Sequence, residues 1–319
     1  MTCALGKILV IANPAAQSGR GDKAADQAVQ LLRDALGQDS VVLAKTAGPR
    51  HASDIAERAS GCDSIVALGG DGVIHEVVQG LMKRSSFDRP HLGIIPVGSG
   101  NDFARALHMP TNINEAVAVL LAGQVDPIDV GWVNNNYFIE TLSFGLDAAI
   151  ALDTMERRKK TGRAGTLLYA EAGIYQLTHN LKAYAYKASF DGSQTQTGES
   201  ITFAVQNGPF YGGGFKICPD AQLDDGAFDI CIAHPPVTLV KALMIFARAK
   251  NGGHVSSKNM ELLRANTLHI EFDEEPPAQI DGEQITGRTF DIRLERAALQ
   301  VIKPRADEAF CNVSKTTSE

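Results

Sequence analysis

Three glycine-rich and polar segments each follow a short apolar run, and their residue types suit phosphate binding. The first runs from Asn13 to Gly21, the second is Gly69-Gly70-Asp71-Gly72-Val73-Ile74-His75-Glu76, and the third runs from Pro96 to Arg105. Glycine lets the backbone approach a ligand closely, and N–H groups at the start of a helix favour an anion. Together the three segments predict a phosphate cradle, although each one alone is equally typical of an ordinary strand–helix turn.

Asp71 sets a further condition on this cradle. A carboxylate about 4 Å from a phosphate charge is repelled by about 4 kcal/mol at an effective dielectric constant of about 20. Asp71 therefore needs a cation between it and the phosphate, or a hydroxyl or proton to engage. A bridging Mg²⁺ ion meets this need, because it prefers one or two carboxylates together with substrate oxygens. The chain has no G-x-x-x-x-G-K-[ST] motif and no G-x-G-x-x-G motif after its first strand, so neither the P-loop nor the dinucleotide-binding fingerprint is present.

The elements that must position these segments alternate between strand and helix. Strands are predicted at Lys7–Ile11, Val41–Leu43, Ser64–Leu68 and Leu92–Val97, and helices at Asp22–Leu36, Ala52–Ala59, Ile74–Met82 and Ile113–Leu121. This alternation indicates βα units on a largely parallel sheet. Ligands of such sheets bind beyond the carboxyl ends of the strands, where the three segments lie.

The pattern changes after about Asp126, where strand-like runs separated by turn residues dominate. These runs are Tyr137–Ser143, Lys182–Phe190, Ser200–Gln206, Phe228–Ile232, Thr267–Phe272, Thr289–Leu294 and Leu299–Ile302. Helical patterns occur only around Thr166–Asn180 and Val237–Ala249. We therefore predict an N-terminal α/β domain over residues 1–127 and a mainly antiparallel β domain over residues 128–302.

Composition limits the classes of function. The chain has 319 residues, a formal net charge of −7 and five scattered cysteines without a Cys-x-x-Cys pair. The negative charge argues against nucleic-acid binding, and the cysteine pattern argues against a zinc site or a disulfide framework. No apolar run approaches the ~20 residues of a membrane span. A cytoplasmic protein is expected, with peripheral membrane contact at most.

The order of the motifs resembles the diacylglycerol kinase catalytic family, and in particular its bacterial lipid kinases. The resemblance is carried by Asn13-Pro14, the Gly69–Glu76 loop, Pro96 to Arg105, Asp129-Val130-Gly131, Ser143 to Asp147, Asn207 to Gly214, Leu223 to Gly226 and Ile280 to Glu283. It implies a three-layer α/β domain like that of phosphofructokinases and NAD kinases, followed by a C-terminal β-sandwich. It also implies that residues 303–319 return to the first domain.

The resemblance implies roles for matching residues. ATP contacts fall on Asn13, Thr46, Gly69, Gly70, Asp71, Gly72, Val73, Ile74, His75, Glu76, Ser99 and Asn101. A structural Mg²⁺ falls on Asp225 with main-chain carbonyls near Gln222 and Ala227. Catalytic roles fall on Asp71 and on a general base, which is either Asp281 or Glu283. Spacing does not decide between Asp281 and Glu283 as the base, although Glu283 is slightly favoured. Without the resemblance, Asp281-Gly282 is more typical of a β-turn.

Two residues of the second segment depart from the family pattern. Val73 stands where the family usually has threonine, so a hydroxyl that could bond to phosphate is lost. His75 stands where asparagine is usual, and we expect a helix-surface residue more than a phosphate donor. Ser99 replaces threonine in the third segment but keeps the hydroxyl. These departures leave open a nucleotide-binding regulator with weak catalysis.

The predicted reaction is transfer of the γ-phosphoryl group of ATP to a lipid hydroxyl, such as that of diacylglycerol. The basic run Glu156-Arg157-Arg158-Lys159-Lys160, beside Leu167-Leu168-Tyr169, suits an anionic membrane surface, although a solvated helix face explains it as well. NAD kinases and phosphofructokinases share the Gly-Gly-Asp-Gly loop, so a small-molecule acceptor is the main alternative. The expected partners are a lipid substrate at the membrane surface and, from the bacterial relatives, a second copy of the chain; nucleic acid is not expected.

Overall fold

The computed structural model describes residues 5–305, which divide into two compact units. Unit 1 comprises the residues up to Ile128 together with those from Ala297 onward, and unit 2 runs from Asp129 to Arg296. The chain therefore returns to unit 1 at Ala297, earlier than the predicted residue 303. Of the predicted returning segment, residues 306–319 lie outside the described residues.

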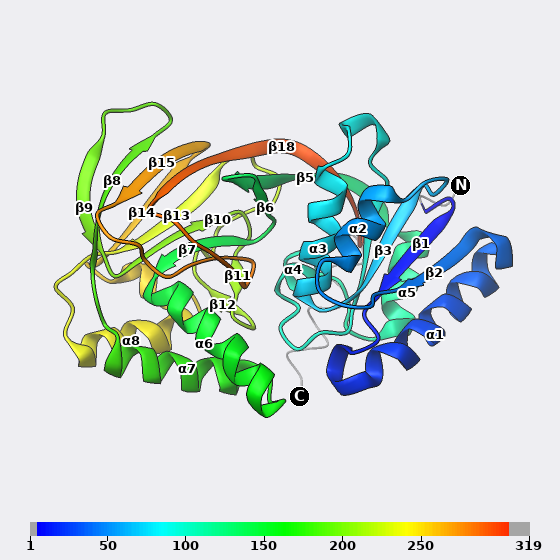
Figure 1. The fold of residues 1–319 in the computed structure, drawn as a ribbon, viewed down its shortest axis with the longest axis horizontal. Helices are drawn as coiled ribbons and strands as arrows, with labels where there is room; N and C mark the ends of the chain where they lie inside the picture. The colour runs from blue at the N-terminus through cyan, green and yellow to red at the C-terminus, as the bar shows by residue number, and fades with distance from the viewer. Residues whose placement is uncertain (1–4, 306–319) are drawn as a thin grey trace. The chain divides into compact units, whose positions relative to one another are not determined.

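Unit 1 is built on four parallel strands in the order β2-β1-β3-β4. Its elements are β1 (Ile8–Ala12), α1 (Ala16–Leu36), β2 (Val41–Lys45), α2 (His51–Arg58), β3 (Ser64–Gly69), α3 (Asp71–Met82), β4 (His91–Pro96), α4 (Asp102–Ala106) and α5 (Ile113–Ala122). Every residue of β3 is buried, because helices cover both faces of the sheet (Figure 1). The predicted α/β class is confirmed.

Two helices of unit 1 differ from the prediction. α1 begins at Ala16 instead of Asp22, so part of the first glycine-containing segment is helical. α4 lies within the third segment, which we expected to be a loop. Its five residues carry no apolar period that a sequence pattern could reveal, and its first turn is held by a contact from a distant residue described below.

Unit 2 contains two facing sheets. Its elements are the end of β5 (Gln124–Val133), β6 (Asn136–Phe138), β7 (Thr141–Gly145), α6 (Leu146–Thr161), α7 (Thr166–His179), β8 (Tyr184–Phe190), β9 (Gln196–Ser200), β10 (Thr202–Gln206), β11 (Phe210–Tyr211), β12 (Phe215–Lys216), β13 (Phe228–Ala233), α8 (Leu239–Ala249), β14 (Met260–Ala265), β15 (Thr267–Phe272), β16 (Ala278–Ile280), β17 (Glu283–Ile285) and most of β18 (Thr289–Lys303). One sheet has the order β14-β13-β10-β7-β16-β17, and the other pairs β18, β15, β8 and β9.

The core of unit 2 lies between these sheets. Phe144, Phe203 and Phe228 from the first sheet pack with Phe272 and Phe290 from the second. Alternation along β10 and β13 sends the intervening side chains to the opposite face of the first sheet. The predicted C-terminal β-sandwich is thereby confirmed.

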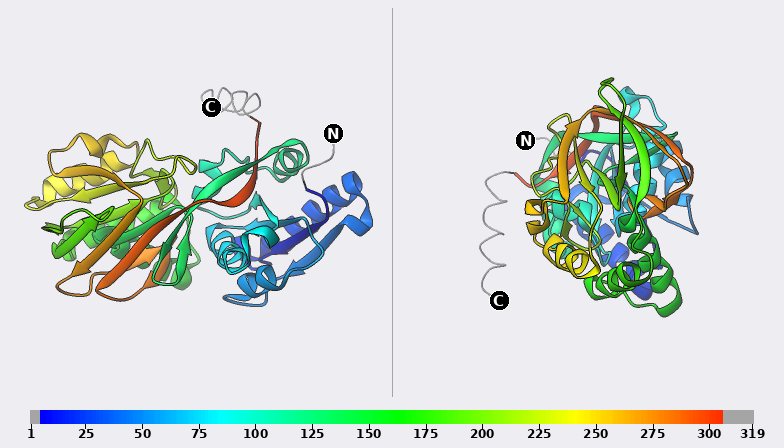
Figure 2. Two further views of the ribbon diagram at one scale, coloured as in Figure 1. Left: turned by 90° about the horizontal axis from the view of Figure 1, so that it is seen from above. Right: turned by 90° about the vertical axis from the view of Figure 1, so that its left-hand side faces the viewer.

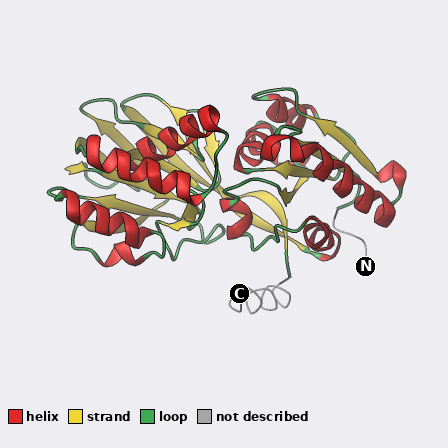
Figure 3. Ribbon diagram, turned by 90° about the horizontal axis from the view of Figure 1, so that it is seen from below, coloured by secondary structure: helices red, strands yellow, loops and turns green. Residues whose placement is uncertain are grey.

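The outer face of the first sheet of unit 2 is covered by α6, α7 and α8 (Figures 1 and 3). We predicted α7 and α8 but not α6, whose 16 residues end in a charged stretch with little amphipathic pattern. Among residues 5–305, none of the helices combines the length and apolarity that crossing a bilayer requires.

β18 is one continuous strand of 15 residues, where the sequence predicted two strands. Residues Thr289–Arg293 pair with β15, and Val301 pairs with β4. Figure 2 shows this strand as one long ribbon that runs from orange to red. The polar residues Glu295 and Arg296 interrupt the apolar alternation midway, which is why the pattern suggested a break.

Candidate active site

The carboxyl ends of the four parallel strands bring the predicted phosphate segments to one edge of the sheet in unit 1. Asn13 follows β1, Thr46 follows β2, Gly70 follows β3, and the segment from Val97 follows β4. Since these strands are neighbours in the order β2-β1-β3-β4, segments far apart in sequence lie beside one another. This is the edge at which open α/β sheets bind ligands.

α3 presents its N-terminus at this edge without a capping side chain. Gly70 occupies the N-cap position in an extended conformation and has no side chain to accept the first N–H groups of the helix. A helix start left open in this way, next to a glycine turn, is a favourable site for an anionic phosphate. This arrangement is the strongest chemical feature of unit 1.

The Asp71 carboxylate turns away from the N-terminus of its own helix and binds the start of α4. Its Oδ2 accepts the N–H of Asn101 at 2.8 Å, and its Oδ1 accepts the N–H of Asp102 at 2.9 Å. Burial raises the pKa of Asp71 to about 6, with the Asp102 charge acting in the same direction and the N–H donors opposing it. These N–H donors offset part of the cost of burying the carboxylate. The Mg²⁺ ion expected between Asp71 and the phosphates stays a prediction.

The second and third segments touch through their glycines. A Cβ atom on Gly98 would lie 2.4 Å from the Cα of Gly70, so any larger residue would push the two segments apart. Asn101, at a φ of 54°, closes its own segment: its Oδ1 accepts the N–H of Gly98 at 2.9 Å, and its Nδ2 donates to the Gly98 carbonyl at 3.0 Å. The Asn101 side chain thus shapes the turn that carries Ser99.

The remaining predicted ATP contacts occupy varied positions. Asn13 Oδ1 accepts the N–H of Ala15 at 2.9 Å and so orders the turn after β1. Glu76 accepts the N–H groups of Arg50 and Ala52 at 2.8 and 3.1 Å, which caps α2. Thr46 is half-buried directly after β2. Their roles toward ATP stay predictions, as do those of Gly69, Gly72, Val73 and Ile74 in the α3 turn.

His75 is buried, so the prediction of a helix-surface residue is wrong. Its side chain is 6% exposed, and its ring Nε2 lies 3.3 Å from the Gln79 amide nitrogen. The error arose because α3 packs against both β3 and α2 and has little solvent-facing surface near its start.

The two candidate bases in unit 2 have different surroundings. The Asp281 carboxylate accepts three main-chain N–H groups, from Ile139 at 2.9 Å and from Glu140 and Thr141 at 3.0 Å each. Glu283, two residues later at the start of β17, is exposed. Asp281 therefore fixes the turn between β16 and β17, and Glu283 is presented beside it.

Asp225 lies in an acidic group that Arg264 partly neutralises. Asp225 Oδ2 is ion-paired with the Arg264 guanidinium, and its Oδ1 accepts the N–H of Ala227 at 3.3 Å. Burial raises the pKa of nearby Asp229, and the charges of Asp225 and Asp220 add to this, while Arg264 opposes it. Oxygen donors in a repelling group suit Mg²⁺ chemically, although no cluster of three metal-binding side chains occurs within residues 5–305.

Comparison with known proteins places these features in a family. Residues 7–133 match the Diacylglycerol kinase catalytic domain family, and residues 140–303 match the YegS C-terminal NAD kinase beta sandwich-like domain. The chain belongs to the diacylglycerol kinase catalytic family. This membership agrees with the resemblance carried by the sequence motifs.

Two relatives named diacylglycerol kinase show how similar this chain is to other members of the family. The protein of Bacillus subtilis (strain 168) is 35% identical over 222 residues, which is 69% of this chain and 71% of that protein. The protein of Staphylococcus haemolyticus is 34% identical over 221 residues, 69% of this chain and 65% of that protein. The chain thus spans slightly less than two thirds of the Staphylococcus haemolyticus protein.

Solved structures extend the comparison. A diacylglycerol kinase from Bacillus anthracis str. Sterne superposes with a TM-score of 0.72 at 25% identity, covering 95% of this chain and 98% of that one. An NAD kinase from Archaeoglobus fulgidus, solved with ATP, gives a TM-score of 0.51 at 13% identity, covering 97% of each chain. The second likeness concerns the fold alone.

In this diacylglycerol kinase family member, the basic run of α6 is largely paired within its own unit. Arg157 contacts Asp153 at 2.8 Å and stacks on the Tyr175 ring, and Lys160 contacts Glu156 at 2.5 Å. Arg158 and Lys159 are exposed. The cationic surface is therefore smaller than the sequence run suggested.

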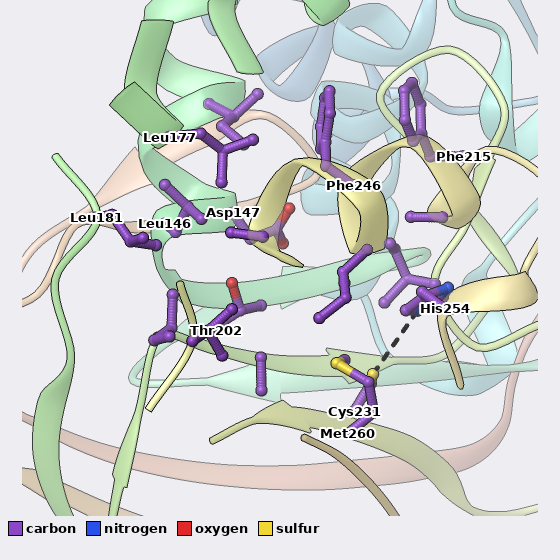
Figure 4. Close-up of a pocket in the computed structure, with 18 of the residues that line it drawn as sticks. Leu146, Asp147, Leu177, Leu181, Thr202, Phe215, Cys231, Phe246, His254 and Met260 are labelled. Carbon is purple, nitrogen blue, oxygen red and sulfur yellow. Dashed lines mark hydrogen bonds between the residues drawn. The ribbon is translucent and has the colours of Figure 1, made fainter. Parts of the chain in front are cut away.

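Sequence reasoning gave no role to two buried aspartates of unit 2. Asp129 accepts the N–H of Gly226 at 2.8 Å and so anchors the Asp225 turn. Asp147, the first acidic residue of α6, lines an apolar pocket between the helices α6 to α8 and the outer face of the six-stranded sheet (Figure 4). A signal for Asp147 was present, since a carboxylate two residues after Gly145, at the end of the strand-like run, is unusual for a core position.

Proposed function

We propose that this chain transfers the γ-phosphoryl group of ATP to the hydroxyl of an uncharged lipid of the diacylglycerol class. The observation that carries the proposal is the open N-terminus of α3 beside the touching glycine turns at Gly70 and Gly98. The Asp71 carboxylate binds N–H groups at the start of the neighbouring helix α4, so the first N–H groups of α3 remain available to the nucleotide phosphates. Family membership supports the same reaction.

In the proposed site, most of the rate acceleration comes from positioning and charge stabilisation, as is general for phosphoryl transfer. The first N–H groups of α3 bind phosphate oxygens, and the half-buried Ser99 offers a hydroxyl from the adjacent turn. Val73 offers no hydroxyl at the position that follows Gly72. The main-chain donors therefore carry more of the phosphate binding in this chain.

Glu283 is the proposed general base. A base needs a free carboxylate oxygen within reach of the acceptor hydroxyl. The oxygens of Asp281 are committed to three N–H groups, whereas Glu283 is exposed at the start of β17. We therefore assign proton removal to Glu283 and the positioning of its turn to Asp281.

Mg²⁺ is proposed in two places of different kind. One accompanies ATP as part of the substrate, where it neutralises phosphate charge. The other is structural and would be held by Asp225 with the carbonyls near Gln222 and Ala227, beside the acidic residues Asp220 and Asp229. There it would share with Arg264 the compensation of these carboxylates.

The lipid acceptor is proposed from the names of the relatives, which are diacylglycerol kinases at 34 and 35% identity. The likeness to NAD kinases concerns the fold at 13% identity and gives no reason to transfer their substrate. An apolar pocket of unit 2, lined by side chains of α6, α7 and α8 and of β10 and β13, independently suits an alkyl chain.

We further propose that the helices of unit 2 contact an anionic membrane. Leu167 on α7 and Val240 on α8 are 68% and 67% exposed, and Arg158 and Lys159 are exposed on α6. Apolar side chains beside cations suit an interface with anionic lipid. Reversing Arg158 and Lys159 to glutamate should weaken co-sedimentation with anionic vesicles at least about tenfold, whereas reversing Lys23 and Lys187 should not. Equal binding of both double variants would contradict the proposed contact.

Replacing the base tests the proposed reaction. Glu283→Gln is expected to lower kcat about 10²- to 10⁴-fold, the usual contribution of general base catalysis. The melting temperature and the affinity for ATP should stay at wild-type values, because Glu283 is exposed. Initial rates with ATP and dioctanoylglycerol, together with calorimetric titration of ATP, measure both quantities. Unchanged kcat in the variant would refute the assignment of the base.

A further inference from the structure

Two buried cysteines of unit 2 are in contact with each other. Cys218 lies shortly after β12 and Cys231 lies on β13; they are 3% and 1% exposed, and both thiols are free. Their sulfur atoms share a hydrogen bond. Cys218 Sγ also donates to the main-chain carbonyl of Asp229 at 3.6 Å, two residues before Cys231 on the same strand. Two thiols held in contact are the starting arrangement for a disulfide, provided that one of them is reactive.

Cys231 also contacts a buried histidine. Its sulfur lies 3.9 Å from Nε2 of His254, whose side chain is 2% exposed (Figure 4). The other ring nitrogen, Nδ1, is buried and has no hydrogen-bond partner among the described residues. The ring thus directs its polar contact to the sulfur. An imidazole placed against a cysteine in this way favours the thiolate.

The two thiols differ in how readily they ionise. The hydrogen bond with Cys218 lowers the pKa of Cys231, and His254 acts in the same direction, whereas burial opposes both. The same hydrogen bond, together with burial, raises the pKa of Cys218 well above its usual range. Cys231 is therefore the group that ionises, and Cys218 is the thiol that donates to it. Because the thiolate is the nucleophile, oxidation is expected to begin at Cys231.

The pocket beneath α6, α7 and α8 gives a small molecule access to this sulfur. Cys231 and His254 are among its lining residues, whereas Cys218 is not. The pocket holds about 680 Å³ of space that no atom fills, part of which is open to solvent. Its walls are mainly apolar, so an uncharged molecule enters at lower cost than an ion. Hydrogen peroxide is small and uncharged at neutral pH, and can therefore reach Cys231 from the pocket.

We propose that Cys218 and Cys231 are a redox-sensitive pair, in which hydrogen peroxide oxidises Cys231 and Cys218 then closes a disulfide. The Cys231 thiolate attacks one peroxide oxygen, the O–O bond breaks, and a sulfenic acid forms while hydroxide leaves. The Cys218 sulfur then attacks the Cys231 sulfur, and the sulfenic hydroxyl leaves as water with the Cys218 proton. The hydroxide takes up the proton that Cys231 had released. Two thiols and one peroxide thus give one disulfide and two molecules of water.

The disulfide would close the segment from Cys218 to Cys231, which contains the Asp225 turn, into a loop. Closing a loop restricts the unfolded chain and so favours the folded protein. Oxidation is therefore expected to raise the melting temperature by at least about 3 °C, and dithiothreitol should return it to its starting value. An unchanged melting temperature of protein that carries the disulfide would contradict this consequence.

Peptide mapping tests the order of oxidation in the wild-type protein. The full chain is treated with hydrogen peroxide at pH 7, alkylated with iodoacetamide in urea and digested with trypsin. Residues 217–241 contain Cys218 and Cys231 but no lysine or arginine before Lys241, so both cysteines fall in one peptide. We expect this peptide to lose two hydrogen atoms and to escape alkylation.

Cys62 is the matched control within the same sample. It is more exposed than either member of the pair, and burial of part of its side chain raises its pKa. If exposure alone governed oxidation, Cys62 would react first. We expect the pair to be oxidised at least about tenfold faster than Cys62. Faster oxidation of Cys62, or the absence of a disulfide within residues 217–241, would overturn the proposal.

Two variants separate the roles of the pair. Cys218→Ser should leave a sulfenic acid on Cys231 that dimedone traps, because no second thiol is in contact with it. Cys231→Ser should leave Cys218 unoxidised under the same conditions, and Cys62→Ser should form the disulfide like the wild type. Dimedone on Cys218 in the Cys231→Ser protein would overturn the assignment of the reactive thiol. Circular dichroism establishes that each variant folds, and the comparison with Cys62 in the wild type needs no variant.

Discussion

Asp71→Asn is expected to reduce phosphoryl transfer by at least about 10²-fold, although Asp71 holds the turn and does not contact the phosphates in our account. The substitution turns an amide N–H toward the N–H of Asn101 or Asp102, which Asp71 now accepts at 2.8 and 2.9 Å. A buried donor without an acceptor costs about 1–3 kcal/mol, and the turn that carries Ser99 would move from the start of α3. Chemical denaturation measures the loss of stability, ATP titration measures the change in ATP affinity, and initial rates measure the loss of activity.

A matched control for this variant is Asp54→Asn, which removes a carboxylate from an exposed position on α2 in the same unit. Its stability, ATP affinity and activity should equal those of the wild type. If Asp71→Asn also kept wild-type ATP affinity and stability, the claim that Asp71 joins the two glycine turns would be wrong.

Asp281→Asn is expected to act mainly through stability and placement. One or two of the N–H groups of Ile139, Glu140 and Thr141 would lose their acceptor, at a cost of about 1–3 kcal/mol each. The turn that presents Glu283 would loosen, so kcat should fall while the affinity for ATP is kept. Denaturation midpoints measure the loss of stability, and initial rates over a range of ATP concentrations separate the change in kcat from any change in KM.

Glu283→Gln serves as the matched comparison, because it changes the other carboxylate of the same turn. The account predicts different patterns: Asp281→Asn loses both stability and activity, whereas Glu283→Gln loses activity alone. If Asp281→Asn were as stable as the wild type and as inactive as Glu283→Gln, Asp281 would be the better candidate for the base.

The order of elements in unit 1 could be predicted from sequence because it depends on local patterns. Apolar runs such as Ser64–Gly69 are bounded by glycine and polar residues, and each is followed by a helical period. Parallel pairing then brings Asn13, Thr46 and Gly70 to one edge without further information. The candidate phosphate site was therefore predictable to the level of which segments meet.

What those segments do to one another could not be predicted in the same way. Asp71 binds N–H groups 30 and 31 positions away, and Asp281 binds N–H groups 140 to 142 positions away. Nothing in the local sequence distinguishes a carboxylate that caps a distant turn from one that awaits a metal or a proton. For the same reason the sequence suggested a cation beside Asp71 but could not reveal its contact with the start of α4.

The pocket of unit 2 was hidden for a related reason. Its lining comes from α6, α7, α8 and several strands, spread between Leu146 and Met260. The strongest local signal among these residues is Asp147. α6 itself was missed, because its apolar face is short and its last turns are charged. Pockets built by side chains from many segments depend on packing that sequence periods do not encode.

The central claim, phosphoryl transfer to a diacylglycerol-like lipid, is tested most directly by identifying the product. The purified protein is incubated with γ-labelled ATP, Mg²⁺, a mixed lipid extract and NAD, and labelled products are identified by mass spectrometry, with Glu283→Gln in parallel. We predict a labelled phosphatidic acid that the variant does not form. Labelled NADP, or labelled inorganic phosphate without any labelled lipid, would contradict the account.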